Sequence, residues 1–252
     1  MRFEQLTAVV TGGGQGIGAA TCRQLAGEGA RVAVLDLDHA AASGVAEEIE
    51  RQGGTALALQ ADVEVEQAVE EAFSRIGEQL GGADILVSNA GITRDRTLLR
   101  MSLEEWDRVM QVHCRGAFLC ARAAARQMVE RRRGKMVFLS STSALGNRGQ
   151  ANYATAKAGI QGLVRTLALE LGPFDVNVNA VAPGFVDTEM TRAVAGRLGL
   201  SLEEFHRQQR ERIPLGRLGQ PEDIARVIAF LCSEEAAYVS GQVLYVNGGR
   251  PS

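Results

Sequence analysis

The stretch Thr11-Gly-Gly-Gly-Gln-Gly-Ile-Gly18 joins an apolar run, Thr7 to Thr11, to a segment with helical character. Glycines permit a tight turn with positive φ and let the backbone approach a pyrophosphate, and a helix N-terminus supplies free N–H groups and a positive dipole end. The strict G-x-G-x-x-G pattern is absent, because the matching glycines fall at positions 12, 16 and 18. A glycine-rich turn without a ligand is the alternative, but the order of strand, turn, helix and second strand favours dinucleotide binding.

Outward from this turn, short runs of apolar and β-branched residues alternate with longer helical patterns. Most of the runs are near-continuously apolar, as is typical of parallel strands that are covered on both faces. The alternation predicts an α/β fold, a single-domain doubly wound (Rossmann) sheet of about seven parallel strands with helices on both faces, formed by residues 1–252. The expected strands are Thr7–Thr11, Arg31–Asp36, Thr55–Gln60, Asp84–Ser88, Lys135–Ser140, Val176–Val181 and Gln242–Val246.

Composition and charge exclude several classes of protein. The chain has 252 residues, 46% of them apolar, and its net charge of −3 argues against a nucleic-acid partner. No apolar run approaches the ~18 residues of a membrane-spanning helix, and the first residues do not begin a signal peptide, so we expect no membrane association. Its four cysteines, Cys22, Cys114, Cys120 and Cys232, show no metal or redox spacing. We therefore expect no metal site and a reduced, cytoplasmic protein.

Helix-start signals place further elements. Ser102 with Glu105, and Ser201 with Glu204, fit capping boxes, in which the two side chains satisfy free backbone donors. One long stretch that we expect to be irregular, at about 183–219, exceeds the usual connection lengths. Such segments are commonly lids or binding loops, so we expect this one to shape a substrate pocket.

Asp36 stands at the end of the second expected strand, 18 residues after Gly18. A carboxylate at this place accepts hydrogen bonds from the adenosine ribose hydroxyls and repels a 2′-phosphate. No lysine or arginine lies between Thr11 and Gly18 or directly after Asp36. A surface carboxylate without a function is the alternative, but the sequence favours NAD over NADP as the cofactor.

Tyr153 and Lys157 lie near the expected start of a helix, four positions apart, so that both side chains share one face. A lysine ammonium beside a phenol favours the phenolate and is expected to lower the tyrosine pKa from its usual value of about 10. Such a tyrosine can exchange a proton with a substrate oxygen while a nicotinamide exchanges hydride. A half-buried tyrosine beside a solvated lysine is the alternative, which the nucleotide-binding turn in the same domain disfavours.

With these motifs in place, the sequence resembles the short-chain dehydrogenase/reductase family along essentially its full length. The matching motifs are Thr11-Gly-x-x-x-Gly16-x-Gly18, Asp62-Val63, Asn89-Ala-Gly91, a serine after the fifth strand, Tyr153-x-x-x-Lys157, and Pro183-Gly184 followed by Thr188. The resemblance implies Asp62 and Val63 near the adenine, Lys157 on the nicotinamide ribose and Thr188 near the carboxamide. The cofactor-binding residues that it implies are Gly12, Gln15, Gly16, Ile17, Gly18, Asp36, Asp62, Val63, Asn89, Ala90, Gly91, Tyr153, Lys157, Pro183, Gly184, Val186 and Thr188.

The resemblance also implies a catalytic serine that holds the substrate oxygen, and two counts place it differently. Counting seven residues forward from Gly134 gives Ser141, whereas counting 13 back from Tyr153 gives Ser140. We choose Ser141, because packing fixes the register of a strand. The loop before Tyr153, in contrast, can lose one residue.

Two positions depart from the family pattern. Family members usually carry an asparagine where this chain has His113, and that asparagine helps to anchor a water in the proton relay to the lysine. Histidine also forms hydrogen bonds, so we hypothesise that His113 supports the relay in catalysis; a histidine with a purely structural hydrogen bond is the alternative. The other departure, Ser88 in place of the first of two asparagines, is mild.

The whole chain looks most like the 3-oxoacyl thioester reductases of the family. Those that act on acyl carrier protein typically use NADPH and present basic residues to the carrier, and Arg131–Arg133 is a candidate for such a patch. An arginine run at a helix end is also favoured by the helix dipole, and the place of a second docking arginine holds Phe174. Because Asp36 favours NAD, we expect oxidation of a 3-hydroxyacyl-CoA or a similar secondary alcohol.

Other readings of the same motifs remain open. A polyol, sugar or steroid dehydrogenase is the alternative within the family, since one scaffold carries many substrates. A non-catalytic NAD-binding sensor is a more remote alternative, which intact Ser141, Tyr153 and Lys157 disfavour. The partner we expect is a small-molecule substrate, and the resemblance implies a homotetramer formed through the helix that carries Tyr153 and through the last strand.

Overall fold

The strand that leads into the glycine-rich turn lies at the centre of one parallel sheet. The computed structural model of the chain describes residues 1–197, 199 and 201–250. In it, seven strands pair in the order β3-β2-β1-β4-β5-β6-β7, and every pairing is parallel. The chain thus builds outward from β1 in one direction and then, from β4, in the other. This reversal is the point at which doubly wound sheets bind their ligands.

The strands and helices follow each other in alternation. The strands are β1 (Thr7–Thr11), β2 (Arg31–Asp36), β3 (Thr55–Gln60), β4 (Ile85–Ser88), β5 (Gly134–Leu139), β6 (Val176–Pro183) and β7 (Val243–Val246). The helices are α1 (Gly16–Gly27), α2 (His39–Arg51), α3 (Glu66–Leu80), α4 (Leu103–Met110), α5 (Gly116–Arg131), α6 (Ala151–Leu171), α7 (Glu189–Arg197), α8 (Leu202–Arg210) and α9 (Pro221–Cys232).

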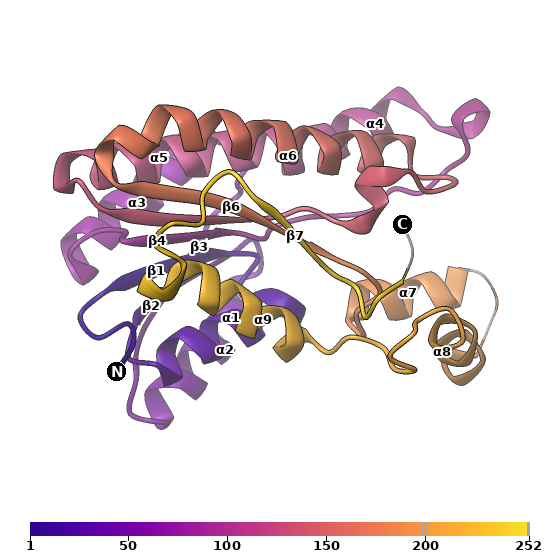
Figure 1. Cartoon of the computed structure of the whole chain (residues 1–252), viewed down its shortest axis with the longest axis horizontal. Coiled ribbons are helices and arrows are strands. Elements are labelled where there is room, and N and C mark those ends of the chain that lie inside the picture. The colour runs from indigo at the N-terminus through magenta and orange to yellow at the C-terminus, as the bar shows by residue number, and fades with distance from the viewer. Residues whose placement is uncertain (198, 200, 251–252) are drawn as a thin grey trace.

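Helices cover both faces of the sheet (Figure 1). On one face, buried side chains of α1, α2 and α9 pack on the strands, and on the other those of α3, α5 and α6 do so. The alternating side chains of each strand therefore enter two separate apolar clusters, which explains the near-continuous apolar runs of the sequence. The predicted fold, a doubly wound sheet of seven parallel strands with helices on both faces, is confirmed.

The segment at about 183–219 differs from the expectation, because it is not irregular. It holds α7 and α8, which lie together beyond the carboxyl ends of the strands (Figure 1). The capping box at Ser102 and Glu105 is complete. At the start of α8, Ser201 accepts a hydrogen bond from the Glu204 N–H, whereas the Glu204 carboxylate pairs with Arg207.

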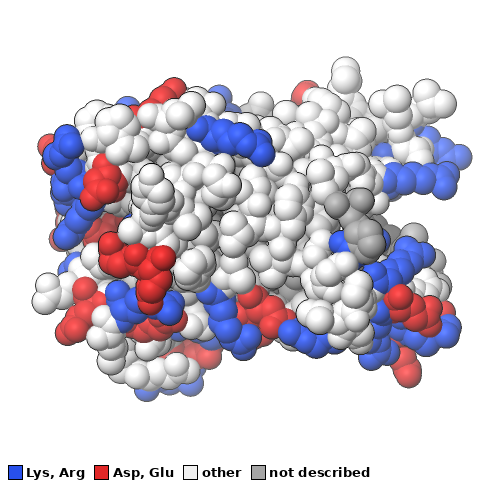
Figure 2. Space-filling model, viewed as in Figure 1, with Lys and Arg blue, Asp and Glu red and all other residues white. Residues whose placement is uncertain are grey.

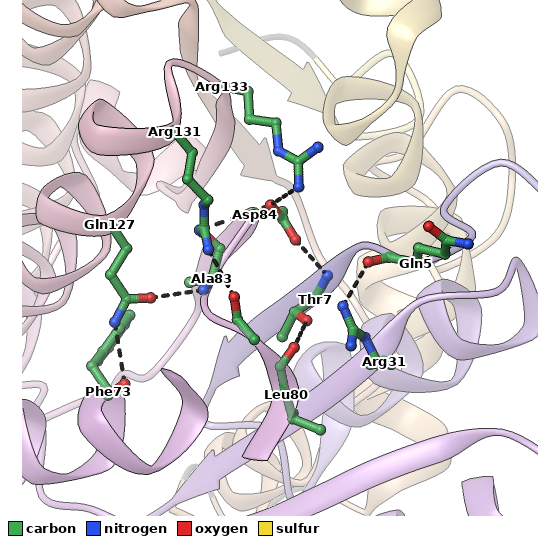
Figure 3. Close-up of polar contacts among 11 residues, drawn as sticks. Gln5, Thr7, Arg31, Phe73, Leu80, Ala83, Asp84, Gln127, Arg131 and Arg133 are labelled. Atoms are coloured by element: carbon green, nitrogen blue, oxygen red, sulfur yellow. Dashed lines mark hydrogen bonds and ion pairs between the residues drawn. The ribbon is translucent and has the colours of Figure 1, made fainter. Parts of the chain in front are cut away.

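At the opposite edge of the sheet, the Asp84 carboxylate joins three segments of the chain (Figure 3). Its Oδ2 accepts a hydrogen bond from the Thr7 N–H at 2.9 Å, and its Oδ1 lies 3.1 Å from Arg133 and 3.8 Å from Arg131. Arg131 also donates to the carbonyl oxygens of Gly81 and Ala83. Two arginines of the Arg131–Arg133 run thus fasten the end of α5 to the starts of β1 and β4.

Within the described part of the chain, no helix is long and apolar enough to cross a membrane. The same residues contain no group of histidine, cysteine and carboxylate side chains that could hold a metal ion. The cysteines are free, and burial raises the pKa of Cys120 and Cys232 to about 12. These thiols are therefore protonated at neutral pH.

Candidate active site

A cavity of about 520 Å³ lies at the carboxyl ends of the strands, where β1 and β4 are neighbours. All the residues that the sequence placed in the site line this cavity, with the exception of Gly18. At one end the lining comes from the segments after β1, β2 and β3, and at the other from those after β5 and β6 and from α6. The predicted residues in the lining are Gly12, Gln15, Gly16, Ile17, Asp36, Asp62, Val63, Asn89, Ala90, Gly91, His113, Ser141, Tyr153, Lys157, Pro183, Gly184, Val186 and Thr188.

The glycine-rich turn has the backbone that its sequence predicts. Gly12 and Gly16 have φ angles of +61° and +53°, in the left-handed region that glycine adopts without strain. Gly18 does not line the cavity, and a Cβ atom there would stand 2.0 Å from the Gly12 carbonyl oxygen. The contact of Gly18 with the cofactor therefore stays a prediction, whereas the structure shows that this glycine allows α1 to pack closely against the turn.

The start of α1 is suited to an anion. Its N-cap residue, Gln15, makes no side-chain hydrogen bond to the helix, and the first turn contains no acidic residue. Backbone N–H groups at the helix start are thus left without a side-chain partner, and the dipole there favours negative charge. A diphosphate fits this place.

The Asp36 carboxylate is half-buried at the edge of the cavity. Its Oδ2 accepts a hydrogen bond from the Gly14 N–H at 2.9 Å, and its Oδ1 accepts one from the Asp38 N–H at 3.1 Å. Because a carboxylate has about four acceptor positions, both oxygens can still bind hydroxyl groups. Asp38 and Asp62 line the same end of the cavity, so this end carries three carboxylates.

Asn89 connects the two strands at the reversal of the sheet. Its Nδ2 donates to the carbonyl oxygens of Thr11 at 3.0 Å and Gly12 at 2.9 Å. The Thr11 hydroxyl in turn accepts hydrogen bonds from the N–H groups of Asn89 and Ala90. Asn89 therefore has mainly a structural role in the cavity wall: its hydrogen bonds hold the glycine-rich turn against the end of β4.

The segment after β6 closes another side of the cavity. The Gly184 N–H donates to the Val246 carbonyl oxygen at 2.9 Å, which holds this segment against β7. Thr191, in the first turn of α7, donates its hydroxyl to the Val186 carbonyl oxygen at 2.8 Å and accepts a hydrogen bond from the Thr188 N–H at 2.9 Å. These bonds fix Val186 and Thr188 in the cavity wall.

Ser141, Tyr153 and Lys157 meet at the other end of the cavity. The Ser141 hydroxyl lies close enough to the phenolic oxygen of Tyr153 to lower its pKa through hydrogen bonding. Ser140 is buried, and its hydroxyl donates to the Lys157 carbonyl oxygen at 2.9 Å. The Ser141 hydroxyl thus lies beside Tyr153, whereas the Ser140 hydroxyl holds α6 against β5.

Burial sets the proton affinities of the pair. Burial raises the pKa of Tyr153 to about 12, against the opposing effect of the Ser141 hydrogen bond. Burial also lowers the pKa of Lys157 to about 7, because the charged ammonium loses water. Its Nζ lies 5.5 Å from the Tyr153 ring centroid and donates to the Leu139 carbonyl oxygen at 2.5 Å. The expected lowering of the Tyr153 pKa is therefore wrong for this arrangement, in which the phenol stays protonated at neutral pH.

His113 lies in a π-helical turn, Gln111–Arg115, between α4 and α5. Its buried Nε2 lies 2.8 Å from the carbonyl oxygen and 3.1 Å from the nitrogen of Ile92. Burial, and then the nearby charge of Lys157, lower the pKa of His113 to about 3, so that the ring is neutral at physiological pH. Nδ1 is buried without a hydrogen-bond partner among the described residues. The ring thus makes the structural hydrogen bond that was the alternative to a relay.

Comparisons with known proteins place the chain among characterised sequences. Residues 12–250 match the family model described as "Enoyl-(Acyl carrier protein) reductase". The chain is 43% identical to the 3-oxoacyl-[acyl-carrier-protein] reductase FabG of Aquifex aeolicus over 99% of its own length and 98% of the relative's. A crystal structure of a short-chain type dehydrogenase/reductase from Mycobacterium marinum superposes with a TM-score of 0.92 at 34% identity, over 98% of this chain and 96% of that one. The chain belongs to the short-chain dehydrogenase/reductase family.

Another relative carries a more general name. The short-chain reductase protein NovJ of Streptomyces niveus is 44% identical over 98% of this chain and 95% of its own. Members of this family are oxidoreductases that bind a nicotinamide cofactor. In this short-chain dehydrogenase/reductase, the uncapped start of α1, the left-handed Gly12 and Gly16 and the carboxylates at the far end of the cavity fit such a group.

Three polar residues of this family member were not found from its sequence. Asn152, fully buried, donates to the carbonyl oxygens of Arg94 and Glu105 and accepts from the Tyr153 N–H, so that it fixes the start of α6. Its position next to Tyr153 was the available signal. Thr191 and Arg108 line the cavity but belong to no motif, and the helices that carry them were needed to find them.

Proposed function

We propose that the protein is an NAD(H)-dependent oxidoreductase that interconverts a secondary alcohol and a ketone, with a 3-hydroxyacyl/3-oxoacyl thioester as the substrate. The observation that carries the proposal is the meeting of Ser141, Tyr153 and Lys157 at one end of a cavity whose other end holds Asp36. The cavity thus combines a proton donor with a carboxylate suited to the adenosine ribose, as the two ends of one bound dinucleotide require.

Tyr153 is the acid and base of the proposed reaction. A bound nicotinamide supplies or accepts the hydride, that is, one proton with an electron pair. In reduction, the Tyr153 O–H bond breaks and its proton goes to the substrate carbonyl oxygen as the carbonyl carbon gains its new C–H bond. In oxidation, the phenol must first release its proton to solvent, so that its oxygen, as the phenolate, takes up the substrate hydroxyl proton while the substrate C–H bond gives up its hydride to the nicotinamide. The raised pKa of Tyr153 keeps the proton available for reduction at neutral pH.

Ser141 and Lys157 support the tyrosine in different ways. The Ser141 hydroxyl stands beside the phenolic oxygen and can donate to the same substrate oxygen, which stabilises the negative charge that develops there. Lys157 has a pKa of about 7 and one hydrogen bond to a backbone carbonyl, which leaves two ammonium donors for the ribose hydroxyls of the cofactor. The neutral His113 holds the residues after β4 in place and does not exchange protons near neutral pH.

The choice of NAD rests on the carboxylates at the adenosine end. Asp36, Asp38 and Asp62 line this end, and a 2′-phosphate would add two further negative charges to it. Arg108 lines the cavity as well, but its guanidinium pairs with Glu64. The local electrostatics thus favour ribose hydroxyls over a phosphate.

The thioester substrate is supported by the activity for which the Aquifex relative is named and by the chain's similarity to it over nearly the full length. The segment at about 183–219 is proposed to contact the substrate, because its first residues line the cavity and its helices α7 and α8 lie beyond the carboxyl ends of the strands (Figure 1). The substrate's carrier group stays open between coenzyme A and acyl carrier protein.

A homotetramer is proposed on the basis of the surface of α6 and β7. Charged side chains gather toward the ends of the molecule in Figure 2, whereas the middle, over β7 and the adjoining part of α6, is largely uncharged. Leu169 on α6 is 80% exposed and Tyr245 on β7 is 40% exposed in the single chain. Burial of such side chains against further copies would remove apolar surface from water.

The experiment is a steady-state assay with NADH and NADPH, with acetoacetyl-CoA as the ketone and a panel of polyols, sugars and steroids with NAD in the reverse direction. We expect thioester turnover, and a preference for NADH of more than about tenfold in kcat/KM, or ~1.4 kcal/mol. A tenfold preference for NADPH would overturn the cofactor proposal. Faster turnover of a polyol, sugar or steroid would overturn the substrate, and NAD binding without turnover of any compound would indicate a sensor.

A further inference from the structure

Arg108 is the one arginine among the described residues that line the cavity. It lies on α4, and Val112, one helical turn further along the chain, lines the cavity too. Asp62 and Val63, which follow β3, belong to the same lining. The family resemblance places Asp62 and Val63 near the adenine, so Arg108 belongs to the adenine end of the cavity and not to the reacting end.

The Arg108 guanidinium is held in place by Glu64. The two side chains form an ion pair, and the Glu64 side chain is 11% exposed. Glu64 is itself fixed through its backbone, because its N–H donates to Asp62 Oδ1 at 3.0 Å and its carbonyl oxygen accepts from Arg115 Nε at 3.0 Å. Glu64, the residue that follows the adenine-lining pair, thus holds the Arg108 guanidinium through an ion pair.

Three other arginines make comparable pairs without reaching the cavity. Arg122 and Arg126 on α5 pair with Glu66 and Glu70 on α3. Arg23 pairs with Glu48. An ion pair alone therefore does not distinguish Arg108, whereas its place in the cavity wall does.

We propose that the planar guanidinium of Arg108 packs against the adenine of the cofactor, and that Glu64 is the positioning residue that holds it there. This inference rests on the proposed NAD function. A guanidinium is planar and weakly hydrated, and it stacks on aromatic rings. Because the charge of Arg108 is balanced by Glu64, the pair offers a face to the base and does not recruit a 2′-phosphate.

The test compares NADH with reduced nicotinamide mononucleotide, which lacks the adenosine, by direct titration of binding through nicotinamide fluorescence. We expect Arg108→Ala to weaken NADH binding about five- to tenfold, which is the typical size of a stacked cation. Binding of the mononucleotide is expected to stay unchanged. Arg126→Ala is the matched control, since it breaks a similar ion pair outside the cavity, and it should change neither affinity.

Two further variants distinguish the contribution of the planar guanidinium face of Arg108 from that of its positive charge. Glu64→Gln frees the guanidinium and is expected to weaken NADH binding less than Arg108→Ala does. Arg108→Lys keeps a cation that can pair with Glu64 but removes the planar guanidinium. This variant is expected to bind NADH as weakly as Arg108→Ala does. Full rescue by lysine would overturn the stacking, because charge alone would then suffice.

The remaining outcomes are equally decisive. Equal weakening of both ligands, or of neither, by Arg108→Ala would overturn the role at the adenine. A larger loss for NADPH than for NADH would assign Arg108 to the 2′-phosphate instead. If the unaltered protein binds NADPH more tightly, the NAD proposal fails, and the adenine contact is tested by NADPH against the mononucleotide. If it binds neither dinucleotide, both proposals fail.

Discussion

The His113 and Tyr153 rings meet edge to face, with centroids 5.2 Å apart and planes at 89°. On its other side, the imidazole fills the space next to Gly91, where a Cβ atom would lie 2.4 Å from His113 Cε1. His113 thus occupies the space between the segment after β4 and the proposed catalytic tyrosine. Its position fixes that of Tyr153 by contact, without a proton of its own to give near neutral pH.

The contact predicts coupled effects of substitutions at Gly91 and His113. Gly91→Ala is expected to lower kcat about 10- to 100-fold, because the new methyl group displaces the imidazole and with it the tyrosine. In the double variant Gly91→Ala/His113→Ala the methyl group has room, so the loss should be smaller than the sum of the two single losses. Steady-state kinetics of the four proteins measure this coupling, and strict additivity would contradict it.

The pH profile distinguishes this positioning role from a proton relay. Since the pKa of His113 is about 3, His113→Ala is expected to lower kcat without moving the apparent pKa values between pH 6 and 9. His113→Asn, which restores a hydrogen-bonding side chain, should recover part of the rate. A shifted limb of the profile in the alanine variant would show that the imidazole takes part in proton transfer. An unchanged rate and profile would exclude both roles.

The two neighbouring serines are expected to respond in opposite ways. Ser141→Ala should lower kcat/KM about 100- to 1,000-fold, since a donor to the substrate oxygen is lost. Ser140→Ala should keep the catalytic rate within a fewfold and lower the free energy of unfolding by about 1 kcal/mol, since the hydrogen bonds of Ser140 with the Lys157 carbonyl oxygen and with Gln161 Nε2 are lost. Kinetics and urea unfolding of both variants check the pair, and the reverse pattern would assign catalysis to Ser140.

Lys157 predicts how cofactor binding depends on pH. With a pKa of about 7, its ammonium is present below that pH and is lost as the pH rises through it. NADH affinity is therefore expected to fall as the pH rises from 6 to 9, because donors to the ribose hydroxyls are lost. Neither His113, with a pKa of about 3, nor Tyr153, with one of about 12, titrates in this range. Fluorescence titrations should show the decline, and Lys157→Met should abolish it; a decline that persists in Lys157→Met would implicate another group.

Site residues could be placed from the sequence where their position depends on backbone geometry or on the end of a strand. The glycine-rich turn, Asp36 and the residues after β4 and β6 could be placed because parallel strands bring their carboxyl ends to one edge. Ser141 was placed next to Tyr153 by counting from Gly134, because pairing across the sheet fixes the register of β5.

What the sequence missed depends on packing between distant segments. The pKa of Tyr153 is raised by burial, and burial is a property of the assembled cavity and not of the Tyr153–Lys157 spacing. The function of Gly18 follows from the approach of α1 to the Gly12 carbonyl group. The capping box at Ser201 and Glu204 marked the start of α8, but α7 and α8 were not expected as helices because each is only nine residues long and mostly polar.

The last prediction concerns stability at the edge of the sheet opposite the cavity. Asp84→Ala leaves the fully buried Thr7 N–H without an acceptor and removes the partner of Arg131 and Arg133, so the free energy of unfolding should fall by about 1–3 kcal/mol. Asp84→Asn keeps an oxygen for the Thr7 N–H and loses the charge, and should cost less. Glu70→Ala, which breaks the exposed pair with Arg126, serves as the control and should cost less than about 1 kcal/mol.

Urea unfolding measures the three variants, and NADH affinity at the distant cavity should be unchanged in all of them. If Asp84→Asn costs as much as Asp84→Ala, the ion pairs hold this edge, and the acceptor for Thr7 contributes little. If Asp84→Ala costs no more than Glu70→Ala, the carboxylate does not fasten α5 to the sheet. The expected order places the larger cost on the buried N–H group, since water cannot replace its lost acceptor, whereas it can solvate the more exposed Arg133.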